Sequence, residues 1–496
     1  MNEALLLLCP VLLPMLAAPL LALPAFRAAR ARNLFVTAVT AATSALLLWV
    51  VLGLGMGKGG AALPLVSIGG GITLTLAADG LSAVYGSIIA LLWPVTAVYA
   101  FDYMKKEAHL PRFYAFFLVS YGVSAGVALA GNMATMYLFF ELLTLATLPL
   151  VMHRMDDEAR FAGRRYLLYS ITGAALGLIA VVFAARFGGG SAAFALGGTL
   201  DPLKVRGSER LLRTVYTLGF FGFGVKVALL PMSLWLPTAS VAPTPVTALL
   251  HAVAVVKAGA FACLRLTYYC FGTPLLYGSA AQTVVTAAAA ATVVLCSFLA
   301  LRSNHLKRRL AWSTASNLSY VLLGAAAMSD AGLLGGCLHM IAHAFIKITL
   351  FFAVGAVMEK AGRAYLDETE GLARRMPVTY ACFAFASAAL IGVPPLPGFF
   401  SKWALCGALL DGGAVAGYIG VGALMVSAVL TALYLCGMLV PAVFPLGGRR
   451  MPGPRLESRP MNAVLLVLCA AILLLGVLHA PLNALVAGWL TGGGIA

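Results

Sequence analysis

The chain has 496 residues, of which 62% are hydrophobic and 10% are charged, and its formal net charge at pH 7 is +16. Soluble domains contain about 25% charged residues, so the composition excludes an ordinary soluble protein. Apolar runs of about twenty residues recur from end to end, which is the pattern of transmembrane helices. A transmembrane barrel would show alternating segments of about ten residues instead. We therefore predict an all-α polytopic membrane protein.

The apolar runs divide into about fourteen predicted membrane-spanning helices. In chain order they cover residues 4–23, 33–54, 78–101, 114–131, 133–152, 166–187, 213–235, 243–270, 281–301, 311–328, 333–358, 378–410, 414–445 and 462–490.

The basic residues are distributed unevenly between the connections of these helices. Of the 33 lysines and arginines, about 22 fall in six connections on one side of the membrane and about five on the other. The positive-inside rule places the basic connections in the cytoplasm and both termini outside. Charge placed in this way reflects topology and contact with lipid headgroups, and it does not indicate nucleic-acid binding.

The nine cysteines all lie in apolar stretches, and none forms a C-x-x-C pair that would indicate a metal or iron–sulfur site. The sequence also has no P-loop and no dinucleotide-binding glycine motif. We expect no metal, no cofactor and no redox chemistry in this chain, so any such chemistry would belong to partner subunits.

Five charged residues inside the predicted helices stand out: Glu141, Lys226, Lys257, Lys347 and Lys402. A charge at the centre of a membrane helix costs roughly 2.5–3.5 kcal/mol. Five unpaired charges would cost on the order of 15 kcal/mol, which exceeds the net stability of many proteins. These side chains must therefore pair, reach water or lose their charge part of the time, as the groups of an ion or proton pathway do.

Glu141 lies in "MATMYLFFELL", and two interpretations are open. It is either a counter-ion that allows one lysine to be buried, or a titrating partner whose attraction depends on whether that lysine is charged. Lys257, in "HAVAVVKAGAF", lies near the middle of its predicted helix, far from either interface. His251 lies six residues before it, on a different helical face.

The clearest spacing occurs in "HMIAHAFIK". His339, His343 and Lys347 follow one another at intervals of four residues, which places them along one helical stripe. Separate hydrogen bonds between helices are one explanation, and a two-histidine metal site is another that lacks a third ligand nearby. A proton relay fits better, because imidazole titrates near neutral pH.

Two predicted helices are interrupted by proline. Proline removes a helical hydrogen bond and frees carbonyl groups that lipid cannot satisfy, so such a break indicates a buried or water-lined site, unless it is only a packing kink. The prolines are Pro231 and Pro237 in the helix of Lys226, and Pro394, Pro395 and Pro397 in the helix of Lys402.

The discontinuous helices are the seventh and twelfth of the predicted spans, five apart. Corresponding broken helices in two halves are typical of inverted-repeat transporters. We therefore predict helices 1–3 in residues 1–110, a first five-helix repeat in 111–270, an inverted second repeat in 281–445, and a last helix in 446–496.

Several motifs resemble the proton-translocating antiporter-like subunit family. The family comprises the antiporter-like subunits of complex I, the large subunits of Mrp sodium/proton antiporters, and homologues in membrane-bound hydrogenases. The resemblance extends from Asp79 to Lys402. The motifs are "APTPVTALLHAVAVVKAGAF" (242–261), "LKRRLAWSTASNLSYVLLG" (306–324), "HAFIKITLFFAVG" (343–355) and "GVPPLPGFFSKW" (392–403).

The resemblance implies a role for each intramembrane group. Glu141 and Lys226 match the coupling pair of the family, and Lys402 matches the terminal lysine. Between them lie the central relay lysine, Lys257, with His251 beside it, and the continuation through His339, His343 and Lys347.

The function implied is a proton-translocating subunit of a complex I-like redox pump, of the NADH-quinone oxidoreductase or membrane-bound hydrogenase type. A subunit of an Mrp-type sodium/proton antiporter is one alternative, and an energising subunit paired with an uptake partner is another. The partners implied are homologous and small membrane subunits and, for a redox pump, soluble redox subunits. The location implied is a bacterial or archaeal inner membrane.

Overall fold

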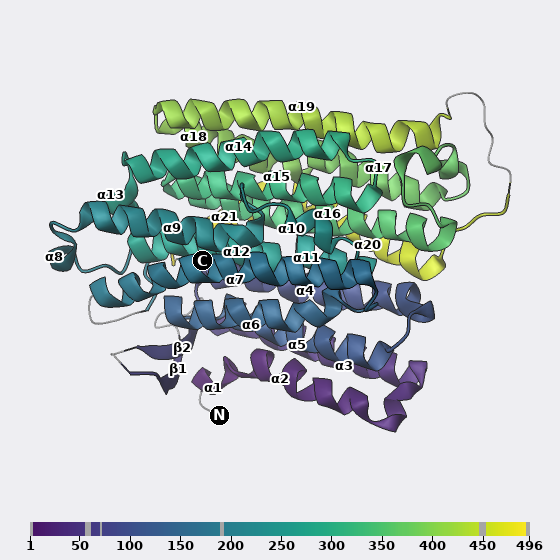
Figure 1. The fold of residues 1–496 in the computed structure, drawn as a ribbon, viewed down its shortest axis with the longest axis horizontal. Helices are drawn as coiled ribbons and strands as arrows, with labels where there is room; N and C mark the ends of the chain where they lie inside the picture. The colour runs from purple at the N-terminus through teal and green to yellow at the C-terminus, as the bar shows by residue number, and fades with distance from the viewer. Residues whose placement is uncertain (1–2, 55–60, 70–71, 189–192, 446–452, 493–496) are drawn as a thin grey trace.

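A computed structural model describes residues 3–54, 61–69, 72–188, 193–445 and 453–492. Its long helices run roughly parallel to one another across the molecule (Figure 1). Within the described residues, ten helices are long and apolar enough to cross a membrane. The prediction of a polytopic α-helical membrane protein is therefore confirmed. The count of fourteen crossings stays a prediction, because several of the expected spans consist of shorter helices.

The N-terminal spans form one edge of the molecule (Figure 1). A two-stranded antiparallel hairpin follows them and leads into the fourth helix. The elements are α1 (Glu3–Leu6), α2 (Cys9–Ala17), the 3₁₀ turn η1 (Ala18–Ala22), α3 (Ala29–Leu48), the π-helical η3 (Trp49–Leu54), β1 (Ala62–Ser67), β2 (Thr73–Ala77) and α4 (Gly80–Tyr103).

Two series of helices follow, joined by short helices at the ends of the molecule. The first contains α5 (Leu110–Ala128), α6 (Met133–Val151), α7 (Asp157–Phe187), α8 (Pro202–Val205), α9 (Glu209–Val227), α10 (Trp235–Ala239), α11 (Thr244–Ala252), α12 (Val255–Leu264) and the π-helical η5 (Arg265–Phe271). After α13 (Thr273–Leu276), the second contains α14 (Ala280–Arg302), α15 (Leu306–Ala327), α16 (Asp330–Ala361), α17 (Pro377–Ile391), α18 (Pro397–Asp411) and α19 (Val415–Val443). The last described helices are α20 (Arg459–Val477) and α21 (His479–Leu490).

Both predicted interruptions are present. The seventh predicted span divides into α9 and α10, and Pro231 lies in the irregular segment between them. The twelfth divides into α17 and α18, and Pro394 and Pro395 lie between those two helices. The inverted relation of the two series stays a prediction.

A third break, which the sequence did not predict, separates α11 from α12. The chain leaves helical geometry at Val253 and Ala254, although no proline lies there. It divides the eighth predicted span between its two ionisable residues, with His251 before the break and Lys257 after it.

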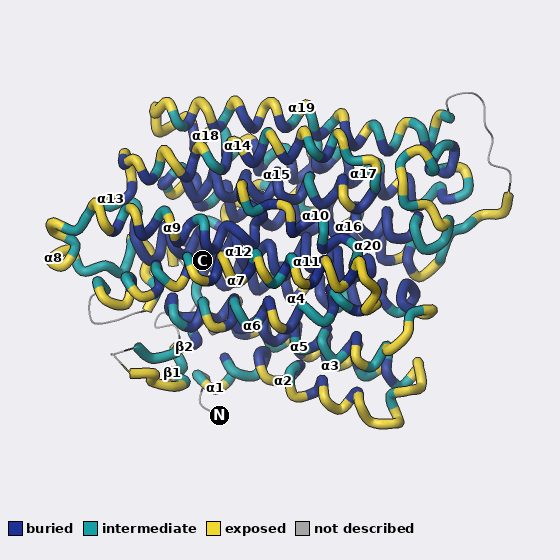
Figure 2. Tube along the Cα trace, viewed as in Figure 1, coloured by how far each residue is buried: buried dark blue, intermediate teal, exposed yellow. Residues whose placement is uncertain are grey.

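The centre of the molecule is formed by the segment α11–η5 and by α16. The most apolar stretch of each is completely buried inside the protein. Figure 2 shows this buried centre, whereas α19 and the N-terminal helices along the two edges carry many exposed residues. All of these helices are apolar, so burial rather than hydropathy distinguishes the centre from the lipid-facing edges.

Hydrogen bonds sort the connections into the two sets that the charge pattern predicts. On one side, the Gly131 N–H donates to the Thr75 carbonyl and the Phe194 N–H donates to the Gly131 carbonyl, each at 2.9 Å. At this end of the helices lie the β-hairpin, α8 and α13 (Figure 1). On the other side, the Leu306 N–H donates to the Ala364 carbonyl at 2.9 Å and joins two of the basic connections.

Candidate functional site

The ionisable residues predicted inside the membrane gather on helices at the centre of the molecule. Four lysines and three histidines from five helices are buried, with at most 9% of their surface exposed. They are Lys226 on α9, His251 on α11, Lys257 on α12, His339, His343 and Lys347 on α16, and Lys402 on α18.

The first lysine of this group, Lys226 on α9, forms an ion pair with Glu141 on α6. The Lys226 Nζ lies 3.7 Å from the Glu141 Oε1, which is longer than a charge-assisted hydrogen bond of about 2.8 Å. The Lys226 ammonium also donates to the Phe140 carbonyl and lies 3.5 Å from the centroid of the Phe140 ring. The Glu141 side chain is 26% exposed, and its Oε1 is buried without a hydrogen-bond partner among the described residues.

The chain directly after Lys226 is held in an unusual backbone conformation. Ala228 has φ of +65°, a left-handed conformation that costs a residue with a side chain roughly 1–2 kcal/mol. Two hydrogen bonds to the Val225 carbonyl restrain this turn, one from the Ala228 N–H at 2.9 Å and one from the Trp235 Nε1 at 2.8 Å. The end of α9 is therefore fixed from the far side of the break, by α10.

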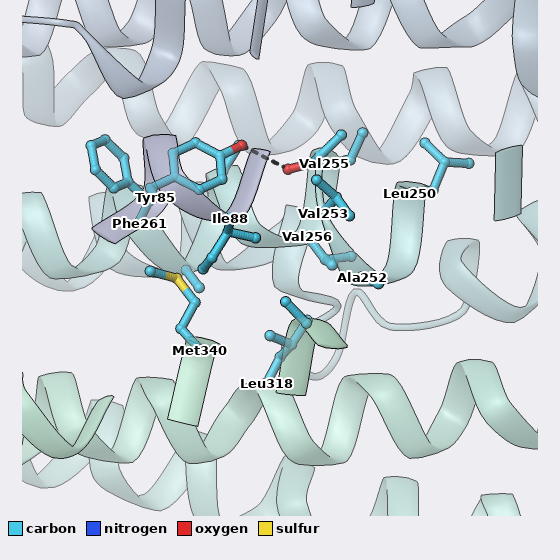
Figure 3. Packing of buried hydrophobic residues seen from close by; sticks show 14 of the residues in the cluster. Tyr85, Ile88, Leu250, Ala252, Val253, Val255, Val256, Phe261, Leu318 and Met340 are labelled. Carbon is cyan, nitrogen blue, oxygen red and sulfur yellow. Dashed lines mark hydrogen bonds between the residues drawn. The ribbon is translucent and has the colours of Figure 1, made fainter. Parts of the chain in front are cut away.

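Lys257 lies one helical turn after the break between α11 and α12. The Tyr85 hydroxyl on α4 donates to the Ala254 carbonyl at 3.1 Å and supports the break. Figure 3 shows the Tyr85 ring beside Phe261, with its hydroxyl directed at the break. On the next turn, Gly259 allows α9 close to α12, because a Cβ there would lie 3.0 Å from the Cβ of Lys226.

Lys257 is joined to α16 by a short hydrogen bond. Its Nζ lies 2.5 Å from the Nδ1 of His343. One of the two groups must carry the proton and the other must accept, so they share a proton across the interface between α12 and α16.

The predicted stripe on α16 is buried as a unit. The ring centroids of His339 and His343 lie 6.0 Å apart, and the Lys347 ammonium donates to the Ser313 Oγ at 2.6 Å. The Nε2 atoms of both histidines are buried and have no hydrogen-bond partner among the described residues. A buried polar atom without a partner costs about 1–3 kcal/mol, so these two atoms favour ordered water between them.

At the far end, the stripe reaches the second broken helix. The Nδ1 of His339 lies 3.0 Å from the Oγ of Ser401 on α18. The next residue, Lys402, donates to the carbonyls of Leu390 and Ile391 at 2.7 Å and 3.0 Å. These carbonyls end α17, so the charge of Lys402 lies at a helix C-terminus, where a cation is favoured. Lys226 occupies the corresponding place in the last turn of α9.

His251 lies apart from the others on the opposite side of the break in span eight. Its Nε2 is 3.4 Å from the Ser240 Oγ, and its ring centroid is 4.8 Å from that of Phe351. Among the described residues no hydrogen bond joins it to Lys257 or to His343. The part that the resemblance gives His251, beside Lys257 in the relay, stays a prediction.

Several buried cations were not identified from the sequence, among them Lys307 and Arg265. Lys307, which we counted with the basic connections, is buried in the first turn of α15 and donates to the Ala242 carbonyl at 2.7 Å. Because arginines follow it in "LKRR", Lys307 looks in the sequence like one more residue of a basic connection. Arg265 binds Asp79 through both guanidinium NH groups and is fully buried. Its position inside the predicted span 243–270 was a signal that it belonged with the intramembrane charges.

No metal site is evident in the part of the chain that the structure describes, since no three His, Cys, Asp or Glu side chains gather to form one. The nine cysteines are free thiols. The side chains of the site carry amines, imidazoles, hydroxyls and one carboxylate, all of which can donate or accept protons.

Comparison with known proteins gives consistent relatives. Residues 130–431 match the family described as NADH:quinone oxidoreductase/Mrp antiporter, TM. The chain is 32% identical to NADH-quinone oxidoreductase subunit N of Desulforudis audaxviator over 379 residues, covering 75% of this chain and 73% of the relative. It is also 32% identical to a probable K(+)/H(+) antiporter protein of Rhizobium meliloti, covering 67% of this chain but 32% of that longer protein.

The fold agrees with these matches. A chain of the archaeal membrane-bound sulfane sulfur reductase, a respiratory membrane complex, superposes with a TM-score of 0.82 and 23% identity, covering 98% of this chain and 97% of that one. The matched family segment contains Glu141 and the four intramembrane lysines, Lys226, Lys257, Lys347 and Lys402. The chain therefore belongs to the NADH:quinone oxidoreductase/Mrp antiporter transmembrane family.

Proposed function

We propose that the chain is a proton-translocating membrane subunit of a complex I-like redox-driven pump, and that protons move along the buried groups from Glu141 to Lys402. The observation that carries this proposal is the 2.5 Å contact between Lys257 and His343, which joins the two series of helices at the centre of the molecule. The partners we propose are homologous and small membrane subunits, with soluble redox subunits supplying the electron chemistry.

The proposed mechanism uses the loose pair of Glu141 and Lys226 as a switch. When the pair is closed, the carboxylate compensates the charge of Lys226. When it opens, the uncompensated charge disfavours a second positive charge on nearby Lys257. The proton of Lys257 then passes to His343 and along α16 toward His339 and the end of α18. Closing the pair makes Lys257 a favourable proton acceptor again.

A second candidate is a subunit of a cation/proton antiporter. The equal identity of 32% to a quinone oxidoreductase protein and to a probable K(+)/H(+) antiporter protein supports it. The same proton line serves in both assemblies, and only the driving reaction differs. Isolation of the native complex with identification of its subunits distinguishes the two, because redox subunits support the pump and small antiporter subunits support the exchanger.

The proton line itself is tested by Lys257→Met in the native complex reconstituted into liposomes. Methionine keeps the apolar stem and removes the amine, so proton translocation should fall by roughly 100-fold or more, the range for loss of a proton-transfer group. The measurement is internal pH with a trapped dye. The matched control is Lys204→Met on the short helix α8, where the amine bonds a surface carbonyl outside the line. Unchanged translocation in Lys257→Met would overturn the proposal.

A further inference from the structure

A cavity of about 440 Å³ lies beside the end of the charged line, where α18 meets α21. Its wall is mostly apolar and includes Phe400, Trp403 and Leu475. Three polar side chains also line it: Ser401 on α18 and His479 and Asn483 on α21. A volume of this size holds several water molecules where polar groups supply hydrogen bonds.

The cavity lies at the level of the second broken helix. At the junction between α20 and α21, Gly476 packs on the irregular segment between α17 and α18, and a Cβ there would lie 2.3 Å from the Pro395 carbonyl oxygen. The last span is therefore interrupted at the same depth as the twelfth. His479 begins α21 directly after this junction.

His479 is an ionisable residue in the last predicted span, and it is not one of the groups of the proposed proton line. Its ring stacks on Phe400, with centroids 3.6 Å apart and an interplanar angle of 2°. Its Nδ1 lies 3.3 Å from the Gly476 carbonyl oxygen. Among the described residues its Nε2 has no hydrogen-bond partner, so this nitrogen is free to exchange a proton with the cavity. The ring is held in place on one face by Phe400.

The link to the buried line is Ser401. Its hydroxyl oxygen lies 3.0 Å from the Nδ1 of His339, it donates to the Gly398 carbonyl at 3.3 Å, and the side chain also lines the cavity. A hydroxyl can accept one proton while it donates another, so it can connect an imidazole inside the protein to water in the cavity. Lys402, the next residue, faces the carbonyls of α17 instead and is not part of the cavity wall.

We propose that this cavity is the place where the line exchanges protons with the aqueous phase, and that His479 is the exchanging group. His339 gives the proton on Nδ1 to the Ser401 hydroxyl, whose own proton passes to water in the cavity and on to His479. His339 becomes neutral and His479 becomes an imidazolium. His479 then releases the proton to the solvent past Asn483 and returns to its neutral form. The inference rests on the proposed proton-translocating function.

The test uses the native complex in liposomes with His479→Ala, Ser401→Ala, Ser401→Thr and Lys257→Met. Translocation should fall at least tenfold in His479→Ala and in Ser401→Ala, and Ser401→Thr should restore it because threonine keeps the hydroxyl. Added imidazole should restore the rate of His479→Ala, because it supplies a proton donor and acceptor in the space that the ring vacates. The control is Leu478→Ala, an exposed neighbour, which should translocate like the parent protein.

The outcomes separate the two proposals. If Lys257→Met translocates normally, the proposed function fails, whatever His479 does. If Lys257→Met is inactive but His479→Ala keeps the parental rate, only the cavity inference fails. Loss of activity in His479→Ala that imidazole does not restore also contradicts it, since that result indicates a packing role against Phe400 or occupation of the cavity by a lipid chain.

Discussion

At the scale of residues, the row of buried ionisable groups from Glu141 to Lys402 (the line) holds more cations than anions. Each of its lysines also forms hydrogen bonds to neutral acceptors. The lysine amines face the Phe140 carbonyl, the His343 imidazole, the Ser313 hydroxyl and the carbonyls that end α17. Glu141 is the one carboxylate that pairs with any of the four intramembrane lysines of the line in the described residues. Because buried like charges repel strongly, charging all of these lysines at the same time is unfavourable.

The ion pair of Asp79 and Arg265 differs from the line because it contains one positive and one negative charge, which compensate each other. Arg265 is fully buried among the rings of Phe194, Phe261 and Tyr269, whose centroids lie 4.7, 5.0 and 4.6 Å from its guanidinium carbon. Asp79 also caps α4 by accepting from the Ser82 N–H at 2.9 Å. The pair therefore ties α4 to the π-helical end of the broken eighth span and has a structural role.

Substitution of this pair tests that role. Asp79→Asn keeps the helix cap but leaves a buried guanidinium without a counter-charge, so the free energy of unfolding should fall by about 3–5 kcal/mol. The double variant Asp79→Asn/Arg265→Met removes the stranded charge and should recover part of this loss. Unfolding in a denaturing detergent titration measures both. Additive losses in the double variant would show that the two residues do not interact.

Much of the residue-level site could be predicted from the sequence, and the reason is physical. A charge in an apolar run has a high energetic cost, so Glu141, Lys226, Lys257 and Lys402 are visible without a structure. Spacing could not reveal which groups touch across helices, such as Lys257 and His343. It also missed Lys307, because a basic cluster at a helix start looks like an ordinary solvated connection.

At the scale of elements, the breaks place helix ends inside the membrane. Lys226 and Lys402 each lie at a helix C-terminus, where the last carbonyls are free to accept hydrogen bonds. Prolines in the sequence predict these two breaks. The break at Val253 and Ala254 has no such signature, because it depends on tertiary contacts such as the hydrogen bond from Tyr85. Local sequence therefore predicts breaks made by proline and not those made by packing.

A substitution at Gly476 tests the contact between the α20–α21 junction and the segment between α17 and α18. Gly476→Ala would place a methyl group 2.3 Å from the Pro395 carbonyl oxygen, so the two junctions must separate, at a cost of about 1–3 kcal/mol in unfolding free energy. The matched control is Gly407→Ala on α18, where a Cβ meets nothing within 4 Å. Equal thermal stability of the two purified variants would contradict the contact.

At the scale of the whole molecule, charge and hydrogen bonding give the same division of the connections. The basic connections bond to one another at one end of the helices, as Leu306 does to Ala364. The poorly charged connections bond to one another at the other end, which carries the hairpin, α8 and α13 (Figure 1). This agreement supports the alternation of basic and poorly charged connections along the chain, from which we predicted the orientation in the membrane. Lys58, one of the few charges on the second side, lies outside the described residues.

The orientation is tested by labelling with a membrane-impermeant maleimide. Cysteine is introduced as Asp157→Cys at the start of α7 or as Leu203→Cys on α8, both highly exposed positions at opposite ends. The positive-inside rule predicts that Leu203→Cys reacts in right-side-out vesicles and Asp157→Cys reacts only in inverted ones. The parent chain with its native cysteines gives the background. Labelling of both positions from the same side would contradict the alternation.

The central claim is that one continuous proton line joins the two series of helices, and His343 is its junction. The His343 Nδ1 is 2.5 Å from the Lys257 Nζ, and its ring centroid is 6.0 Å from that of His339. The most direct measurement is the number of protons translocated per turnover of the driving reaction in reconstituted His343→Ala complex. The account predicts that translocation falls by roughly 100-fold or more while the subunits stay assembled. An unchanged ratio of protons to turnover would contradict it.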